Sequence, residues 1–542
     1  MMASLRPRRD EEDGYVAVFV ALLMVVLVGM AAFTVDVGQW YVTGQQAQRA
    51  ADAAALGGVP ELPDDQPDAF AAAQQLAAAN GFQDGVETAT VTPAIDGQPT
   101  RLRVTVSRTV DNIFGPLLGL DQTTITRTAV ADYAGPVAMG SPCNQFGNDP
   151  EATSASRSAA CEDTGEFWAN VGSLRATKQS GDAFQNGVCS GGDDGCTGST
   201  NDDYDPNGYF YTVTLSRAVS NLQLEAFDPA LINVGDLCTQ NLTGAAAIPA
   251  ASTDPGTEPS QRYKAGPDSP YCTGDVRFGG TGQVATEFTV REMTDASDPW
   301  DPLSYPVVSG CQQTFPGFNG ALAEKLNRSV ATYDAYVASV FRRWRPLCTI
   351  PAADAGTYLI QVKTNGVGAD AASGHNRFGL RGWSSGDSSA KDAIAIAGYN
   401  KMAVYANLPS ATTLFHLARL PSGSGGQVLN VRLFDVGDSS NTGTIQVVAP
   451  DGFDFSGCKG YGPQGGVSGT DLPTCSVTAN SSSFQGKWQT IAVPIPDDYG
   501  CDDEDPTACW AKLQYSYGSG NQPTDTTSWQ ASIEGDPVRL VE

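Results

Sequence analysis

Hydrophobic and polar positions follow three successive patterns along the chain. Residues 15–35 form an uncharged apolar run, and about 20 such residues are enough to cross a membrane as a helix. Residues 36–58 then place Val37, Gly44, Ala47 and Ala51 at helical spacing. From about residue 143, short runs of Tyr, Phe, Val, Thr and Leu are separated by Gly, Pro, Asp and Ser. The patterns predict a membrane-spanning helix, its continuation beyond the membrane, and antiparallel strands.

A small α+β unit is expected directly after the long helix. Residues 66–81 read as an Ala-rich helix that ends at Asn80-Gly81. Three strands follow at 86–92, 101–108 and 123–131, and apolar residues alternate with polar ones from Arg101 to Ser107. We therefore expect residues 36–135 to form one membrane-proximal unit.

The remaining chain is expected to form two β-sandwich-like domains, at 143–310 and 350–542. Residues 311–349 would bridge them, because 319–344 has apolar residues at helical spacing. Segments 208–230 and 413–438 share an aromatic strand, a polar loop and a strand ending in Phe-Asp. This recurrence suggests a duplication, although two unrelated hairpins would also look alike.

Flanking charges predict the orientation of the apolar run. Arg6, Arg8 and Arg9 precede it, and the next basic residue is Arg49. By the positive-inside rule, residues 1–14 stay in the cytoplasm and the bulk of the chain is extracytoplasmic. A cleaved signal peptide is the alternative, but its apolar core would be shorter and no clear small-x-small site follows.

The net charge of the chain argues against one class of binding partner. The formal net charge is −28, with 60 acidic and 32 basic residues. Nucleic acid is not expected as a partner, because polyanion binding needs clustered Lys and Arg.

The cysteines all follow residue 142, on the side of the apolar run that we expect to be exported. Disulfides persist in oxidising compartments, and the sequence contains no CxxC pair that would favour zinc. Sequence does not determine connectivity. Sequential pairing is our hypothesis: Cys143–Cys161, Cys189–Cys196, Cys238–Cys272, Cys311–Cys348, Cys458–Cys475 and Cys501–Cys509.

A family resemblance rests on the residues after the apolar run. They are Asp36-Val37-Gly38, Tyr41, a Gln-rich turn and AADAAALGG at 50–58. Together they resemble the N-terminal region of TadG-like proteins of the Flp (Tad) pilus-assembly system, and the likeness continues through 101–120 and 123–136. The motif residues are Asp36, Gly38, Tyr41, Ala51, Asp52, Ala53, Ala54, Ala55, Leu56 and Gly57.

The resemblance implies a pseudopilin-like layout and, as partners, the bilayer and Flp/Tad pilus-assembly components or pseudopilins. Two family features are missing. Pilin precursors are cut after a Gly, with Glu at the fifth mature position, but the fifth residue after Gly14 is Phe19. The Asp-x-Ser-x-Ser metal motif of a von Willebrand factor A domain is also absent from the sequence. Neither pilin processing nor that kind of metal-dependent adhesion is expected.

Catalytic signals are weak. His375 and His416 are the two histidines, and no GxSxG, HExxH or Walker A motif occurs. Acidic clusters at 193–194, 202–205 and 502–505 lie among Gly, Ser, Asn and Cys, as solvated loop charges do. Calcium at Asp202, Asp203 and Asp205 is the metal to consider, without EF-hand spacing; otherwise we expect no cofactor.

The sequence therefore predicts an α+β, mostly β protein with a transmembrane helix, a pseudopilin-like unit and two disulfide-braced antiparallel sandwiches. We expect a single-pass, membrane-anchored structural protein of Flp/Tad pilus assembly and not an enzyme. The alternative is a cell-surface adhesin or carbohydrate binder that uses the C-terminal sandwich. Trp383, Trp488, Trp510 and Trp529 could contact a surface glycan, although strand alternation would bury most of them.

Overall fold

The chain forms two compact units. The N-terminal unit comprises Met1–Ala134 and Asp536–Glu542, and the β unit comprises Gly135–Gly535. The computed structural model describes residues 13–540, except for 63–65, 97, 134–135, 150–155, 162–166, 230–275, 278–283, 295–300, 316–330, 332, 342, 365–372, 408–411, 438–441, 504, 518–523 and 534–537.

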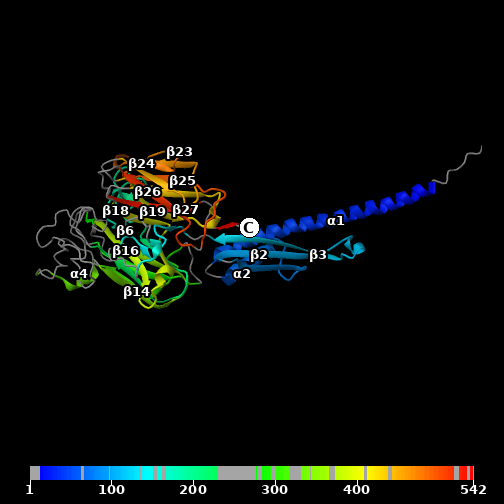
Figure 1. Cartoon of the computed structure of the whole chain (residues 1–542), viewed down its shortest axis with the longest axis horizontal. Coiled ribbons are helices and arrows are strands. Elements are labelled where there is room, and N and C mark those ends of the chain that lie inside the picture. The colour runs from blue at the N-terminus through cyan, green and yellow to red at the C-terminus, as the bar shows by residue number, and fades with distance from the viewer. Residues whose placement is uncertain are drawn as a thin grey trace, which may run out of the picture. The chain divides into compact units, whose positions relative to one another are not determined.

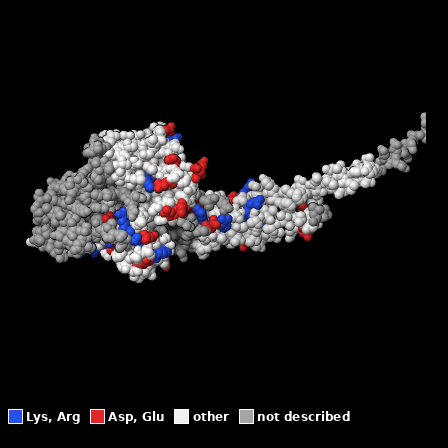
Figure 2. Space-filling model, in the orientation of Figure 1, with Lys and Arg blue, Asp and Glu red and all other residues white. Residues whose placement is uncertain are grey.

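A single long helix, α1 (Asp13–Gly58), begins the N-terminal unit (Figure 1). Its first half contains an 18-residue window with a mean hydropathy of 2.9 that is exposed throughout. Within the described part of the chain, this helix is the one long and apolar enough to cross a membrane. Figure 2 shows the first half of the helix without charged side chains on the visible face. The predicted helix at 15–35 and its continuation are thus one element.

The second half of α1 packs on a helix and a sheet. Helix α2 (Gln66–Ala79) ends as predicted: Gly81 takes a φ of +88°, and the amide of Phe82 donates to the carbonyl of Ala77. Such a left-handed C-terminal turn suits glycine, which has no Cβ to clash. The core of this unit consists mainly of small residues, including Ala47, Ala54 and Ala73, so the two helices and the sheet approach closely.

The sheet of this unit has four antiparallel strands in the order β1-β2-β3-β28. Leu102, Val104 and Val106 are fully buried, as the alternation predicted. The three expected strands are confirmed, although the first is shifted from 86–92 to 89–96 and the other two are longer than expected. The strands are β1 (Ala89–Asp96), β2 (Gln98–Asp111), β3 (Gln122–Tyr133) and β28 (Val538–Leu540).

Strand β28 was not anticipated. We expected residues 350–542 to lie in one sandwich, but Val538 and Leu540 pair with Tyr133 and Ala131 of β3. The chain therefore leaves the N-terminal unit after β3, forms the β unit, and returns to the same sheet.

The β unit contains two large antiparallel sheets. Figure 1 shows labelled strands from β14 at the bottom to β23 at the top. The first sheet follows the order β14-β10-β16-β6-β18-β27-β20-β25-β22-β23, with β5 and β11 paired to β16. The second follows β13-β12-β15-β9-β17-β4-β19-β26-β21-β24. Both contribute to one continuous hydrophobic core.

Each sheet is made of two halves with the same connectivity. In the first half, eight strands numbered along the chain lie in the orders 1-8-3-6 and 2-7-4-5. This is the strand order of a jelly roll, a sandwich of two Greek keys. The strands are β6 (Trp168–Gly172), β9 (Tyr209–Leu215), β10 (Val219–Phe227), β12 (Thr286–Glu292), β13 (Val307–Phe315), β14 (Trp344–Ala353), β15 (Gly356–Lys363) and β16 (Gly374–Ser384).

The second half repeats the same two strand orders. Its eight strands are β18 (Lys401–Asn407), β19 (Thr412–Arg419), β20 (Val428–Phe434), β21 (Gly443–Val448), β24 (Ser476–Ala479), β25 (Trp488–Pro494), β26 (Trp510–Tyr517) and β27 (Thr524–Ile533). The hairpin of β22 (Cys458–Gly462) and β23 (Gly466–Leu472) is inserted between the fourth and fifth strands. The suspected duplication is supported, because β9-β10 and β19-β20 are the second and third strands of their jelly rolls.

The two jelly rolls are joined edge to edge. Strand β6 pairs with β18 in one sheet, and β17 (Ile394–Tyr399) and β4 (Ala138–Met139) connect β9 to β19 in the other. The division expected near residues 311–349 therefore differs from the structure. The chain passes from one jelly roll to the other at Asn400, between β17 and β18. Short apolar runs separated by Gly, Pro, Asp and Ser occur on both sides of Asn400, so only the strand pairing reveals the boundary between the jelly rolls.

The expected bridging helix also differs. Residues 311–315 and 344–349 belong to β13 and β14 of the first jelly roll, and the described helix between these strands is the short α4 (Ala335–Val340). Most of the expected helix at 319–344 lies outside the described residues. Further short elements of the β unit are β5 (Gln145–Phe146), β7 (Cys196–Thr197), β8 (Thr200–Asn201), β11 (Val276–Arg277) and α5 (Ser481–Phe484).

The structure contains five of the disulfides that sequential pairing predicts, and Cys238–Cys272 lies outside the described residues. Cys311–Cys348 joins β13 to β14, which are edge strands of opposite sheets. Cys458–Cys475 likewise joins β22 of one sheet to the residue before β24 of the other. These two bridges therefore tie the sheets together toward the two outer ends of the β unit. The predicted class, an N-terminal helix followed by disulfide-braced, mostly antiparallel β-structure, is confirmed.

Candidate functional site

In the motif region of α1, residues 36–57, one face packs into the core of the N-terminal unit. Ala47, Ala51, Ala54 and Ala55 are fully buried in the core of the N-terminal unit. A Cβ on Gly58 would lie 2.6 Å from the carbonyl oxygen of Ala69 and 2.7 Å from Leu102. A Cβ on Gly57 would clash with the side chain of Leu76. The small residues of AADAAALGG therefore allow α1, α2 and the sheet to pack closely.

The opposite face of the same helical segment is exposed. Tyr41 is 68% exposed, Val42 54% and Val37 40%. Gly38 has open space around it, since nothing would lie within 4 Å of a Cβ there. Together with Gln45 and Gln46, these residues recur at i, i+3 and i+4 and form one stripe. We call residues 37, 38, 41, 42, 45 and 46 the exposed stripe.

Asp36 lies at the end of the apolar half of α1 and is almost fully buried. Its carboxylate accepts hydrogen bonds from three consecutive backbone amides, those of Ile113, Phe114 and Gly115, at 2.8–3.3 Å. These amides begin the short 3-10 helix η2 (Gly115–Leu118) between β2 and β3. Consecutive amides of this kind form an anion-binding nest. Asp36 thus fixes the β2–β3 connection against the helix.

A second polar contact supports this attachment. The indole nitrogen of Trp40 donates to the side-chain oxygen of Asn112 at 2.8 Å. The amide group of Asn112 donates in turn to the carbonyl of Leu120 at 2.9 Å. Trp40 therefore also orders the connection between the strands.

The β unit has a cavity of about 310 Å³ at the seam of its two jelly rolls. Thr212 and Thr214 of β9, Ala395 of β17, and Arg419 and Trp510 of β19 and β26 line it. Several hydroxyl groups and two carboxylates face this space, which suits a small polar ligand. The seam cavity exists only because the two sheets are continuous.

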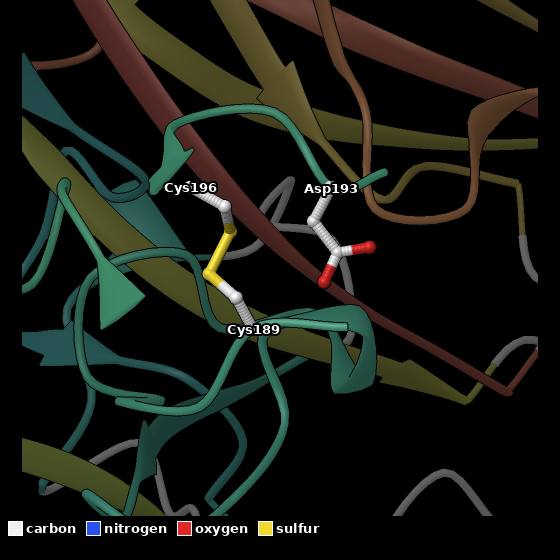
Figure 3. Close-up of side chains that lie close together, drawn as sticks. All are labelled: Cys189, Asp193 and Cys196. Carbon is white, nitrogen blue, oxygen red and sulfur yellow. A yellow bond between two sulfur atoms is a disulfide. The ribbon is translucent and has the colours of Figure 1, made fainter. Parts of the chain in front are cut away.

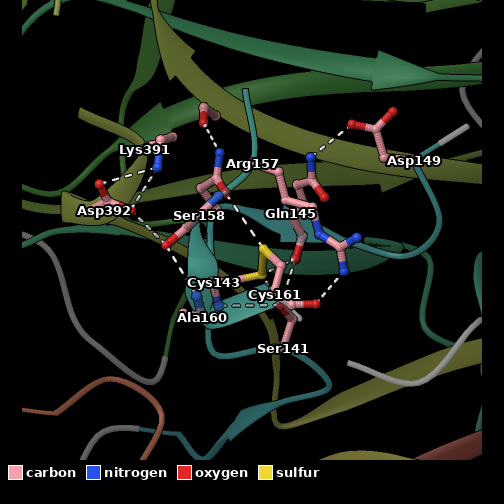
Figure 4. Close-up of a disulfide and its surroundings, with 12 residues drawn as sticks. Ser141, Cys143, Gln145, Asp149, Arg157, Ser158, Ala160, Cys161, Lys391 and Asp392 are labelled. Carbon is pink, nitrogen blue, oxygen red and sulfur yellow. Dashed lines mark hydrogen bonds and ion pairs between the residues drawn. A yellow bond between two sulfur atoms is a disulfide. The ribbon is translucent and has the colours of Figure 1, made fainter. Parts of the chain in front are cut away.

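One wall of the seam cavity is the loop closed by Cys143–Cys161, whose surroundings Figure 4 shows. The hydroxyl of Ser158 donates to Asp392 at 2.9 Å, and Lys391 pairs with the same carboxylate at 3.1 Å. The disulfide and these contacts hold the loop next to β17.

The acidic clusters are engaged by basic residues and are not simply solvated. Lys178 is fully buried and pairs with Asp203 at 2.7 Å. Asp205 pairs with Lys401 at 2.6 Å, and Asp194 pairs with Lys487 at 3.0 Å. Since Lys401 and Lys487 belong to the second jelly roll, the loop at 189–205 ties the two jelly rolls together.

Calcium binding at Asp202, Asp203 and Asp205 stays a prediction. Each carboxylate contacts a different group: Asp202 accepts from the hydroxyl of Thr197, Asp203 pairs with Lys178, and Asp205 pairs with Lys401. Among the described residues, two clusters have metal-like spacing, and neither contains these aspartates.

Those two clusters are Cys189, Asp193 and Cys196, and Cys501, Asp503 and Cys509. Figure 3 shows Asp193 beside the disulfide that joins Cys189 to Cys196. The second pair of cysteines is also a disulfide. Because oxidised cysteines offer no thiolate ligand, these clusters are disulfide loops with a neighbouring carboxylate.

The histidines lie in strands and are buried. Nε2 of His375 is 3.0 Å from the amide nitrogen of Asn186. Burial, with a smaller contribution from Arg377, lowers the pKa of His375 to about 3. His375 therefore stays neutral near pH 7, as a core residue would.

Asp182 is a buried residue that sequence reasoning missed. It accepts hydrogen bonds from the amides of Gly172, Phe184 and Gln185 and from the hydroxyl of Tyr209. Burial raises the pKa of its carboxyl above the usual value. Its role is to organise the loop after β6.

The tryptophans considered for glycan binding are mostly core residues. Trp488, Trp510 and Trp529 are 7%, 2% and 0% exposed, and Trp383 is half-buried. Of these, Trp510 lines the seam cavity. Alternation along the strands had predicted this burial.

These features define a class: a protein with one apolar helix suited to anchoring, a small α+β unit built on that helix, and a tandem jelly-roll unit inserted before its last strand. Residues 14–79 match the family model described as Flp pilus-assembly TadE/G-like. The resemblance inferred for the N-terminal region is confirmed there, and this match associates the region with Flp/Tad pilus assembly. No curated protein and no solved structure matches the chain.

Proposed function

We propose that the protein is a single-pass, membrane-anchored component of Flp/Tad pilus assembly that acts by binding partners and not by catalysis. The TadE/G-like match of residues 14–79 supports the assembly context, and the apolar half of α1 supports the anchor. The partners would be pseudopilins or other assembly components with a similar apolar helix.

In this proposal the N-terminus lies in the cytoplasm and the β unit lies outside. Arg6, Arg8 and Arg9 favour this orientation. The five disulfides support it as well, since such bridges persist in oxidising compartments.

The observation that carries the proposal is the exposed stripe on α1. The motif residues divide by direction: Ala51, Ala54 and Ala55 are buried in the unit, while Gly38 and Tyr41 face outward. Packing within the unit explains the first set but not the second. Since the stripe continues the apolar helix, a second membrane-anchored helix could pack along both, with its backbone close to Gly38.

The stripe can be tested by photocrosslinking in cells that assemble the pilus. A photoreactive amino acid replaces Tyr41 in the full-length protein, and the matched control replaces Ala71, which is exposed on α2. We expect an ultraviolet-dependent adduct from position 41 with a product of the pilus locus, identified by mass spectrometry, and none from position 71.

Piliation provides the second readout. Tyr41→Arg should reduce the number of pili per cell while leaving the amount of membrane-bound protein unchanged, because Tyr41 contributes little to the core. Equal adducts from both positions, or normal piliation after deletion of the gene, would contradict the proposal.

The seam cavity favours a second candidate function, binding of a surface saccharide. Hydroxyls of Thr212, Thr214 and Ser216 and the charged groups of Asp392 and Arg419 line it, and such groups can hydrogen-bond sugar hydroxyls. The binding region would then be the seam and not the C-terminal sandwich alone.

A glycan array probed with residues 136–533 tests this candidate. Thr214→Trp should abolish any binding, because a bulky side chain would enter the cavity from an exposed position. Thr444→Trp is the matched control, since Thr444 is exposed on β21 of the same sheet. Absence of binding by the parent protein, or equal loss in both variants, would count against the seam as a sugar site.

A further inference from the structure

The connection between β2 and β3 has an unusual surface. We call residues 112–120, with the sequence NIFGPLLGL, the hairpin tip. It contains no charged residue, although Asp111 and Asp121 flank it. Ile113 is 62% exposed, Leu120 51% and Phe114 37%. Water would not stabilise such a group of apolar side chains at the end of a hairpin.

The hairpin tip lies beside the last turns of the apolar run. Together they enclose a mostly apolar cavity of about 120 Å³. Gly29, Phe33 and Asp36 line it from α1, and Phe114 and Leu120 line it from the hairpin tip. The hairpin tip therefore reaches the same level of the helix as residues 29–36.

Helix length places that level within the bilayer. A span of ~30 Å requires about 20 helical residues at about 1.5 Å per residue. The run from Tyr15 to Val35 just meets this requirement. If the membrane ended before Gly29, about 14 residues would remain, or about 21 Å. Residues 29–35 are therefore needed inside the membrane, and their neighbour, the hairpin tip, lies at the same depth.

Several polar backbone groups of the hairpin tip have internal partners. Asp36 accepts from the amides of Ile113, Phe114 and Gly115. The amide of Leu120 donates to the carbonyl of Gly115, and that of Gly119 donates to Pro116, which has no amide hydrogen of its own. Backbone that enters a membrane must be satisfied in this way, because lipid offers no hydrogen bonds.

We propose that the hairpin tip inserts into the leaflet in which α1 ends, so that the N-terminal unit contacts the bilayer at two places. The occupant of the apolar surface is lipid: its acyl chains contact Ile113, Phe114 and Leu120. Asp36 acts as a positioning residue that keeps the hairpin tip folded at that depth. With two contacts the unit has a defined tilt on the membrane, which directs the exposed stripe toward neighbours in the same plane. This inference rests on α1 being the membrane anchor.

Depth-dependent quenching tests the insertion. The full-length protein is placed in nanodiscs of phosphatidylcholine and phosphatidylglycerol. An environment-sensitive fluorescent amino acid is incorporated at Ile113 or at Leu120, which leaves the cysteines untouched. The reference positions are Val26, exposed on the apolar helix, and Ala71, exposed on α2.

We expect nitroxide-labelled lipids to quench positions 113, 120 and 26, and aqueous iodide to quench position 71. If iodide alone quenches the probes at positions 113 and 120 while nitroxide-labelled lipid quenches the probe at position 26, the proposed insertion is wrong. The assignment of α1 as the anchor would then still hold. A position 26 that responds only to iodide would overturn the anchor and, with it, the insertion, so the two failures are distinguishable.

A charge variant provides an independent readout. Ile113→Asp changes a side chain that is exposed within the protein, so the fold of the unit should be retained. It should cause a loss of lipid quenching of the probe at Leu120, because a carboxylate disfavours insertion. Ile113→Leu is the matched control and should keep the quenching. Equal lipid quenching in both variants would contradict the proposal.

Discussion

At the scale of single residues, three buried charged or polar side chains hold parts of the fold together. Asp36, Lys178 and Asp182 are buried charged or polar groups, and each bonds several backbone or side-chain partners. Such groups are costly to bury unless they are satisfied. They hold loops in place, and their removal should change the local structure of those loops.

Asp36→Asn should loosen the β2–β3 connection. The neutral side chain of asparagine is a weaker hydrogen-bond acceptor for the backbone N–H groups of residues 113–115 than the carboxylate. Losing a hydrogen bond to a charged group costs about 2 kcal/mol. Hydrogen exchange of these amides should accelerate by about 30-fold. Asp111→Asn is the control, because Asp111 is exposed and its carboxylate accepts a hydrogen bond from the side chain of Gln122 and not from the amides of residues 113–115. Equal acceleration in both variants would contradict the role of Asp36.

His375 should make the β unit less stable as the pH falls. Its pKa is about 3 in the folded protein and about 6.5 in an unfolded chain. The unfolded state therefore binds a proton below pH 6.5 that the folded state does not. The contribution of neutral His375 to the free energy of unfolding is complete above pH 6.5 and is lost progressively as the pH falls toward 3.

Between pH 7 and pH 5 the loss from His375 should be about 2 kcal/mol of unfolding free energy. Urea denaturation of residues 136–533 at both pH values, with and without His375→Gln, measures it. Asp182 is present in both proteins, so the difference between them isolates the histidine. The same pH dependence in the two proteins would show that folding does not lower the pKa of His375.

At the scale of elements, the two faces of α1 have different surroundings: one is buried in the N-terminal unit and the other is exposed. Alanines on one face let the helix approach the sheet and α2, and the exposed stripe occupies the other. Glycines on the two faces should therefore respond differently to the same substitution.

Gly58→Ala should destabilise the N-terminal unit by about 1–3 kcal/mol, because the new methyl group would meet the carbonyl of Ala69. Gly38→Ala should be neutral or stabilise the helix by about 0.5–1 kcal/mol, since space is open there. Thermal unfolding in detergent compares them. A larger loss for Gly38→Ala would reverse the assignment of the two faces.

At the scale of the whole molecule, the N-terminal unit is completed by the end of the chain. Tyr133 and Val538 are opposite each other in adjacent antiparallel strands. The core of the unit consists of residues between Ala47 and Ala131. The entire β unit is thus an insertion between two neighbouring strands.

Replacing residues 134–537 by Asn-Gly should yield a folded N-terminal unit, because this pair forms the turn that closes a two-residue hairpin. Circular dichroism and a cooperative thermal transition in nanodiscs would show it. The control lacks β28 as well and ends at Tyr133, and it should show faster hydrogen exchange along β3. A control as stable as the hairpin variant would mean that β28 contributes nothing to the sheet.

The β unit should unfold in a single transition. Its hydrophobic core is continuous, and β6 and β18 join the two jelly rolls within one sheet. Calorimetry of residues 136–533 should give equal calorimetric and van't Hoff enthalpies. Two separate transitions would show that the jelly rolls are independent domains.

Local pattern was sufficient for much of this description. The apolar run, the Ala-rich helices and the alternation around Val104 predicted the two helices and three of the four strands of the N-terminal unit. The sequential pairing of the five described disulfides also agrees with the hypothesis made from spacing. The helices and strands depend on neighbours within a few tens of residues, so the sequence by itself determined them, whereas it left the connectivity of the cysteines open.

Contacts between distant residues were decided only by tertiary structure. Val538 pairs with Tyr133, and the carboxylate of Asp36 binds the amides of residues 113–115, so both contacts join residues far apart in sequence. The boundary between the jelly rolls at Asn400 likewise depends on which distant strands pair. Hydrophobic periodicity shows which face of a strand is buried but not which strand lies beside it. The partners of each strand depend on the packing of the complete sheets, and the seam cavity and the hairpin tip exist only as a result of that packing.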